Sequence, residues 1–336
     1  MSRLAIVGEC RKRLRLAAFL VLAVLGGCGS KMTDVSTVAS PTQSSATAAP
    51  QTGVLANGIE TSTITVVIRR PNGNPIAGRT VQLTATGSNN RIVQPADTDQ
   101  NGTTTGTIAS TTAETKTITI AVLQGSHVIE LAQHPTVEFV GGELNISASL
   151  STATASTAAV IADGVATSTI TVTVRDTNGN PVAGQAVQLT SSGSNNTLVQ
   201  PGITDASGVA AGTIASTTAE TKTVTATVNP GPGQVVVAQQ PDVLFVGDPN
   251  NLSAALSTAV AAPSTNVVAN GVATSTITVT VRDSNGNPVA AQSVALASTG
   301  SNNTLVQPGI TDVNGVATGT IATTTAETKT ITATVN

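Results

Sequence analysis

Two short segments combine the residue types that bind calcium. Residues 176–180 read DTNGN and residues 283–287 read DSNGN, so a carboxylate is followed by two amides at alternate positions. Oxygen ligands at this spacing open a calcium-binding loop, but such a loop also needs a carboxylate at its twelfth position, where this chain has Val187 and Val294. We therefore interpret both segments as hairpin turns, in which Asn-Gly accepts positive φ angles. The counterpart at 70–74, RPNGN, lacks the Asp.

The other residues that could support metal binding or catalysis form no recognisable site. His127 and His134 are the only histidines, and neither has a cysteine or a carboxylate cluster beside it at metal-ligand spacing. We expect both to be surface residues. Serine and threonine are abundant, but no Gly-x-Ser-x-Gly motif occurs and no helix is indicated. The sequence therefore predicts no catalytic residue, no metal site and no cofactor, and a protein that is not an enzyme.

The N-terminal segment is typical of an export signal. It begins with basic residues, continues with the apolar run Leu16–Leu25, and ends with small residues before Cys28. The sequence Leu-Gly-Gly-Cys resembles the lipobox of bacterial lipoproteins, and this resemblance implies cleavage after residue 27 and a lipid attached to Cys28. Gly29, in place of Asp, implies transport to the outer membrane. The alternative is an ordinary cleaved signal with an incidental cysteine.

Cleavage at this point would change the cysteine content and the charge of the chain. Cys10 would be removed and Cys28 would be the only cysteine left, so no disulfide could form and packing alone must hold the domains together. Residues 1–27 also contain five of the 15 basic and one of the 18 acidic residues, which leaves a net charge of −7. Without a basic surface or stacking aromatic residues, nucleic-acid binding is not expected. Residues 28–46, rich in Ser, Thr and Ala, are predicted to form a flexible tether.

The remainder of the chain contains three copies of one pattern. The segment VATSTITVTVRD occurs at 165–176 and at 272–283, and a close variant occurs at 60–70. Further along each copy, SNNTLVQPGITD occurs at 194–205 and at 301–312. A repeat of roughly 100 residues is too long for a solenoid unit, so the pattern indicates whole domains in series.

Within one copy, apolar residues alternate with polar ones. Ile170, Val172 and Val174 alternate with threonines, which predicts a half-buried β-strand with its aliphatic side chains on one face. Short strands of this kind, separated by turn signals, predict an antiparallel β-sandwich of immunoglobulin type. Phe139 and Phe245 occupy the same position in successive copies, so we expect both to fill the core of their domain.

These motifs together resemble the group 1 bacterial immunoglobulin-like domains that occur in tandem in invasin and intimin proteins. The resemblance rests on a strand, the turn Asp-x-x-Gly-Asn-Pro-Val and the next strand, in the same order, and it covers residues 45–336. It implies an all-β fold of three tandem immunoglobulin-like β-sandwiches. The first copy departs from the turn with Arg70 and Pro71, where the others have Asp and a small polar residue. The third copy departs from the pattern with Ala291, where the others have Gly78 and Gly184. The outer-membrane barrel and the lectin-like tip of invasins and intimins have no counterpart here, so receptor binding does not follow from the resemblance.

The copies predict the domain boundaries. We expect a lipoprotein signal at 1–27, the tether at 28–46, and immunoglobulin-like domains at 47–142, 148–247 and 254–336. The third domain lacks the segment that carries the core phenylalanine in the other two. We therefore expect it to lack its last strand and to be the least stable domain, and we expect the natural chain to continue and supply that strand.

Two classes of function remain open at this stage. In the first, this is a non-enzymatic lipoprotein of the cell outer membrane, exposed at the surface and anchored through Cys28, whose repeats act as a structural stalk or spacer. In the second, it is an adhesin whose repeats bind a protein or surface ligand that the sequence does not identify. Interface hot spots are rich in Trp, Tyr and Arg, whereas the aromatic residues after the signal are both assigned to domain cores. The composition thus favours the stalk.

Overall fold

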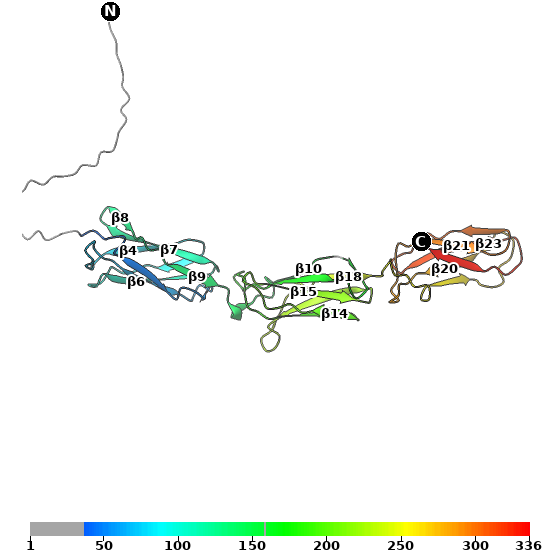
Figure 1. Cartoon of the computed structure of the whole chain (residues 1–336), viewed down its shortest axis with the longest axis horizontal. Coiled ribbons are helices and arrows are strands. Elements are labelled where there is room, and N and C mark those ends of the chain that lie inside the picture. The colour runs from blue at the N-terminus through cyan, green and yellow to red at the C-terminus, as the bar shows by residue number, and fades with distance from the viewer. Residues whose placement is uncertain (1–36, 158) are drawn as a thin grey trace, which may run out of the picture. The chain divides into compact units, whose positions relative to one another are not determined.

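Each of the three repeats folds into two β-sheets that face each other (Figure 1). The computed structural model describes residues 37–336 with the exception of residue 158. Within this part of the chain the elements are β-strands, apart from one 3-10 turn, η1 (Glu143–Asn145). No helix in the same residues is long and apolar enough to cross a membrane. The prediction of tandem all-β sandwiches is confirmed.

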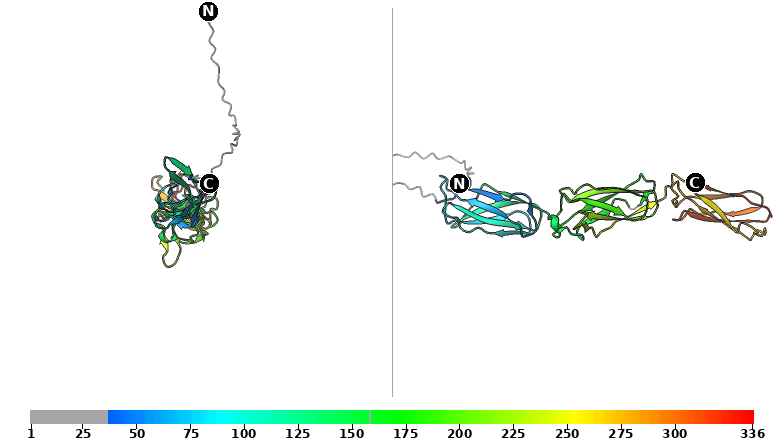
Figure 2. Two further views of the ribbon diagram at one scale, coloured as in Figure 1. Left: turned by 90° about the vertical axis from the view of Figure 1, so that its left-hand side faces the viewer. Right: turned by 90° about the horizontal axis from the view of Figure 1, so that it is seen from below.

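The first repeat has two sheets of different composition. One sheet contains, in spatial order, β1 (Ser45–Ala49), β3 (Ser62–Val67), β6 (Thr103–Ser110) and β5 (Asn90–Val93). The other contains β2 (Val54–Leu55), β9 (Thr136–Val140), β7 (Thr115–Gln124) and β4 (Thr80–Ala85), and β8 (His127–Glu130) pairs with β7. The two layers are visible from other directions in Figure 2.

The second repeat has the same arrangement. Its first sheet contains β10 (Thr152–Ala155), β12 (Ser168–Thr173), β15 (Val209–Ser216) and β14 (Asn196–Val199). Its second sheet contains β11 (Ala159–Ile161), β18 (Asp242–Val246), β16 (Thr221–Val228) and β13 (Val187–Ser191), and β17 (Val235–Val236) pairs with β16.

The third repeat retains one complete sheet and part of the other. The complete sheet contains β19 (Thr258–Ala262), β20 (Ser275–Thr280), β23 (Val316–Thr323) and β22 (Asn303–Val306). The second sheet is reduced to β21 (Val294–Ser298) and β24 (Ile331–Val335). The prediction that this repeat lacks its last strand is confirmed, and it also lacks the short strand that corresponds to β11.

The cores follow from the alternation read in the sequence. In β12 and the residue that follows it, Ile170, Val172 and Val174 are fully buried, whereas the intervening threonines are half-exposed. Burial of each such side chain contributes about 1.5–3 kcal/mol to folding. Among the described residues the buried clusters contain 18 hydrophobic residues in the first repeat, 17 in the second and 8 in the third. The third core is thus the smallest, and side chains such as Ile331 only pack against its edge.

The two phenylalanines lie in these cores, as predicted. Phe139 is 2% exposed and Phe245 is 1% exposed, and each lies in the last strand of its repeat. This last strand is held on both sides, because β18 pairs antiparallel with β16 and parallel with β11. The first repeat has the same parallel pairing between β2 and β9. The sandwiches are therefore not antiparallel throughout, which the sequence did not indicate because these parallel strands are only two or three residues long.

The first repeat also begins earlier than predicted. Residues 37–46 were assigned to the tether, but Ala39 is buried in the core cluster and β1 starts at Ser45. The backbone N–H of Ser40 donates to Arg69 O at 2.8 Å. A segment rich in Ser and Ala has the composition of a tether, but these small side chains also allow it to pack closely against the sheet. The boundary predicted after residue 46 is therefore too late.

Candidate functional site

The segment at 176–180 forms a tight turn, as predicted, and its Asp organises it. Asp176 Oδ1 accepts hydrogen bonds from the backbone N–H groups of Asn178 and Asn180, at 2.8 and 2.9 Å. Asp176 Oδ2 accepts from Asn180 Nδ2 at 3.0 Å. Gly179 is the residue with positive φ, +83°, which glycine adopts without steric cost. We call residues 176–180 and their counterparts at 283–287 the docking turns.

The docking turn of the second repeat contacts the first repeat. Asn180 Oδ1 accepts from the backbone N–H of Ala113 at 2.7 Å, and Asn180 Nδ2 donates to Thr111 O at 3.1 Å. Asn178 Nδ2 donates to Ala56 O at 3.1 Å. All three backbone groups belong to loops of the first repeat. The side chains of one repeat thus complete the hydrogen bonding of the repeat before it, which the sequence analysis did not foresee.

The docking turn of the third repeat makes the same contacts with the second. Asn287 Oδ1 accepts from Ala219 N at 2.8 Å, and Asn287 Nδ2 donates to Thr217 O at 3.0 Å. Asn285 Nδ2 donates to Ala162 O at 3.0 Å. The recurrence of three equivalent hydrogen bonds at both junctions shows that the repeats share one interdomain interface.

The chain that links two repeats passes directly over this turn. Gly141 follows the last strand of the first repeat, and a Cβ atom placed on it would lie 2.2 Å from Pro181 O. Gly247 has the same relation to Pro288 O, at 2.3 Å. At the next position, Gly142 N donates to Asp176 Oδ2 at 3.3 Å. The linker therefore requires glycine for close approach, and it binds the same carboxylate that orders the docking turn.

The two docking turns are buried, whereas their counterpart in the first repeat is exposed. Asp176 and Asn180 are 2% and 5% exposed, and the corresponding residues of the third repeat are equally buried. In the first repeat Asn74, which corresponds to Asn180, is exposed, and Arg70 replaces the Asp. The Asp and the buried Asn thus occur together in the repeats that follow another immunoglobulin-like repeat in this chain. The Asp-x-Asn-x-Asn pattern is explained by the interdomain interface.

The geometry of the docking turn at 176–180 does not support a calcium-binding loop. The oxygens of Asp176 face N–H donors, and the twelfth position, Val187, is a buried valine of β13. No group of three or more His, Cys, Asp or Glu in the described part of the chain could hold a metal ion. His127 and His134 are both exposed, as predicted. Cys28 lies outside the described residues.

A second polar cluster recurs in each repeat and was missed in the sequence. Lys222, in β16, is fully buried, and its Nζ donates to Glu220 Oε1 and to Ser194 O, the latter at 2.5 Å. The hydrogen bond from Lys222 and that from the backbone N–H of Ser194 hold the pKa of Glu220 below its ordinary value of 4.5. The recurrent Ala-Glu-Thr-Lys segment was the available signal, since Lys222 has the same parity in the strand as the buried Val224 and Ala226.

Comparison with known proteins identifies the repeats. The model of the bacterial Ig-like domain (group 1) matches residues 44–140, 150–245 and 257–336, which is most of the chain. The chain belongs to this family. The three matched segments coincide with the three sandwiches, and the resemblance noted in the sequence is confirmed.

One curated relative is the inverse autotransporter adhesin YeeJ of Escherichia coli (strain K12). It is 31% identical to this chain over 288 residues, which are 82% of this chain and 12% of that protein. The chain thus spans about an eighth of the length of this relative. YeeJ is named as an adhesin.

Solved structures show the same fold. The Escherichia coli adhesin FdeC superposes with a TM-score of 0.62 at 21% identity, covering 89% of this chain and 94% of that one. InvD of Yersinia pseudotuberculosis gives 0.59 at 18% identity, over 88% and 84%. Invasin, described as a bacterial integrin-binding protein, gives 0.51 at 24% identity, over 86% and 56%. The family and these neighbours are immunoglobulin-like domains of adhesins, not enzymes.

Proposed function

We propose that this chain is a non-enzymatic lipoprotein at the bacterial cell surface whose repeats act as a structural stalk. The observation that carries this proposal is the interdomain interface, which recurs at both junctions with the same hydrogen bonds. Hydrogen bonds between buried groups are directional, so they restrict how one repeat can turn against the next. A spacer needs that restriction, whereas a flexible string of domains does not.

The lipid anchor is the second part of this proposal. The sequence Leu-Gly-Gly-Cys supports a lipid on Cys28 that holds the chain at the outer membrane. Replacement C28S should abolish metabolic labelling with a fatty-acid probe and release the protein from the membrane fraction. Unchanged labelling of the variant would contradict the anchor and leave the stalk to be tested separately.

The stalk is tested by the accessibility of an epitope placed after Asn336 on intact cells. Binding of a Fab fragment to this epitope should fall when the second repeat (residues 141–246) is deleted, because the epitope then lies closer to the membrane. Replacement of both buried amides, N180D and N287D, should also reduce the amount of Fab bound, because it removes the hydrogen bonds between repeats. N74D, at the exposed equivalent position, should leave the amount of bound Fab unchanged. Equal Fab binding by all variants would refute the stalk.

An adhesin in which the repeats bind a ligand is favoured by one observation. Ile59, Val165 and Val272 occupy equivalent positions after a glycine and are 82%, 79% and 80% exposed. Exposed aliphatic side chains that recur in this way can form part of a contact surface. If the repeats bind host cells or matrix proteins, the purified chain should show saturable binding that falls when these three residues become Ser. A stalk without adhesive activity should show no saturable binding before or after the change.

A further inference from the structure

The junction between the second and third repeats contains an apolar cleft of about 540 Å³. Its walls come from both repeats and from the linker, with Leu244 and Val246 on the second repeat, Pro249 in the linker and Val313 on the third repeat. Among the described residues that line it, Glu220 is the only charged one. We call this space the junction cleft.

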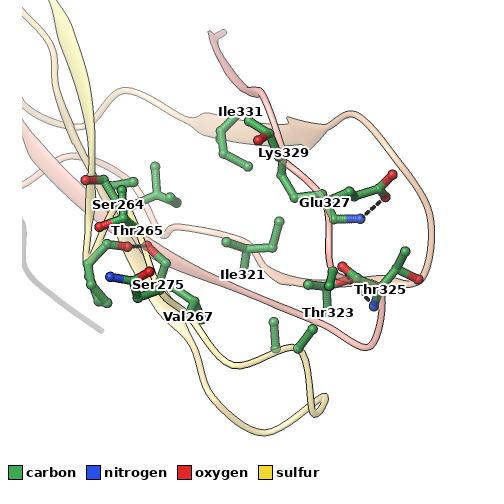
Figure 3. A pocket seen from close by; sticks show the side chains of 18 residues that line it. Ser264, Thr265, Val267, Ser275, Ile321, Thr323, Thr325, Glu327, Lys329 and Ile331 are labelled. Carbon is green, nitrogen blue, oxygen red and sulfur yellow. Dashed lines mark hydrogen bonds and ion pairs between the residues drawn. The ribbon is translucent and has the colours of Figure 1, made fainter.

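A cavity of about 420 Å³ in the third repeat is of a different kind (Figure 3). Polar side chains contribute to its lining, and Lys329 is paired there with Glu327. Residues of a single repeat surround it, so its shape does not depend on the orientation of one repeat against another. The junction cleft does depend on that orientation, because its two walls belong to different repeats.

The apolar side chains of the junction cleft are partly open to water. Val313 is 82% exposed, and Leu244 and Val246 are 43% and 37% exposed. The two residues of β18 point away from the core of their repeat, since Val243 and Phe245, which alternate with them, are buried in it. Rotation that narrows the cleft removes this apolar surface from water, and the hydrophobic effect therefore favours it.

The first junction carries different residues at the equivalent positions. Glu138 stands in the position of Leu244, and Ala206 stands in the position of Val313. Both residues of the first junction are exposed. Closure there would take a carboxylate out of water and would bury little apolar surface, so it is unfavourable. The two junctions thus share the hydrogen bonds of the docking turns but differ in the residues beside them.

The docking turn of the third repeat provides the point about which the cleft can close. Asn287 bonds to Ala219 N at 2.8 Å and to Thr217 O at 3.0 Å. Ala219 also lines the junction cleft, so these hydrogen bonds lie at its edge. Hydrogen bonds weaken steeply only when their angle falls below about 120°, and a small rotation about this point therefore retains them.

We propose that the second junction is a hinge with two states, the open state described above and a closed state in which Val313 packs against Leu244 and Val246. Closure turns the third repeat against the second while the docking turn stays bonded. The first junction, with Glu138 and Ala206, has the open state alone. A chain built in this way bends at one defined place. The hinge does not depend on the lipid anchor or on a stalk function, because it follows from the junction cleft.

The test compares the two junctions of the full chain by pulsed electron resonance, after both native cysteines are replaced by Ser. One pair of spin labels is attached to cysteines introduced at Asp242, on the same face of β18 as Leu244, and at Asn314, next to Val313. The second pair is attached at the equivalent positions of the first junction, and all four positions are exposed: Thr136, Ser207, Asp242 and Asn314.

The expected result is two distances for the label pair at the second junction, the shorter one from the closed state, and one distance for the pair at the first junction. A single distance at both junctions, or two distances at both, would overturn the proposal.

Exchange of residues between the junctions makes the test specific. L244E combined with V313A gives the second junction the residues of the first and should lower the ratio of closed to open molecules at least tenfold. E138L combined with A206V should create a shorter distance at the first junction. V272A changes a valine that is 80% exposed but does not line the cleft, and it should leave the ratio within twofold.

Slow amide exchange in β16 and β23 verifies that the second and third repeats are folded in each variant. An unchanged ratio in the folded L244E/V313A chain, an equal effect of V272A, or the absence of a shorter distance in E138L/A206V would also overturn the hinge.

Discussion

Replacement of Asn180 by Asp tests the interdomain interface with almost no change in side-chain size. The amide nitrogen of Asn180 donates to Thr111 O at 3.1 Å and to Asp176 Oδ2 at 3.0 Å. An oxygen in its place faces two acceptors. Loss of two hydrogen bonds costs about 1–3 kcal/mol. Two carboxylates about 3 Å apart also repel by roughly 5 kcal/mol at an effective dielectric constant near 20, and proton uptake by one of them relieves part of this. We expect the docking turn and the interface together to lose about 3 kcal/mol or more at pH 7, since only the hydrogen bond to Thr111 O crosses between repeats.

The assay measures the distribution of distances between the first two repeats. Gln82 and Gln188 are exposed equivalent positions in β4 and β13. Spin labels can be attached to cysteines introduced at these two positions once Cys10 and Cys28 are replaced by Ser. Pulsed electron resonance should give a narrow distribution for the parent chain and a broad one for N180D at pH 7.

The control is N74D, which makes the same change in the exposed turn of the first repeat. It should leave the distance distribution unchanged and alter the free energy of unfolding by no more than about 0.5 kcal/mol. Indistinguishable distributions for N180D and the parent chain would show that these hydrogen bonds do not hold the repeats together.

Four further predictions follow from the structure. G141A should also broaden the distance distribution, because its Cβ would overlap Pro181 O, whereas G142A, whose Cβ meets only Asn145 Nδ2 at 4.0 Å, should not; equal effects would refute the close approach. A291G should raise the melting temperature of the third repeat by an amount equivalent to about 1 kcal/mol, because Ala291 has a φ of +59°, and a decrease would contradict the inferred strain. Limited proteolysis should cleave within residues 255–336 before the second repeat, since the third core is smaller, and simultaneous cleavage would count against this reasoning. Glu114, Glu220 and Glu327 have pKa values lowered chiefly by hydrogen bonds from their lysines. Their contribution to folding stability is therefore complete above the unfolded pKa of 4.5 and is lost as pH falls through the lower folded pKa values. Thermal unfolding from pH 6 to 2 should show this loss of stability, and E220Q should make the loss smaller for the second repeat.

The sequence predicted the elements that depend on local pattern. Alternation around Ile170 and Val172 predicted a strand with one buried face, and the equivalent positions of Phe139 and Phe245 predicted the core. These succeed because burial in a two-layer sandwich has the same period as the strand itself. The turn at 176–180 was also predicted, because Asn-Gly determines its local geometry.

The sequence predicted the turn at the candidate site but not its contacts with the neighbouring repeat. Asp and Asn are common in turns for local reasons, so their additional role between repeats leaves no separate local signal. The available clue was the difference between copies, since Arg70 and the exposed Asn74 stand where the later repeats have a buried Asp and Asn. The buried Lys222 was missed for a related reason: a threonine-rich strand gives no indication of which end of the sandwich a long side chain can reach.

Both halves of the interdomain interface are present within a single repeat. The second repeat contributes the Asn178 and Asn180 side chains to the repeat before it, and the backbone of Ala162 and Ala219 to the repeat after it. Unequal recombination that adds or removes a copy of the second repeat therefore leaves every remaining junction chemically matched. Gene length can then vary in steps of one domain without compensating mutations, and near-identical neighbouring copies, which favour such recombination, carry no structural penalty.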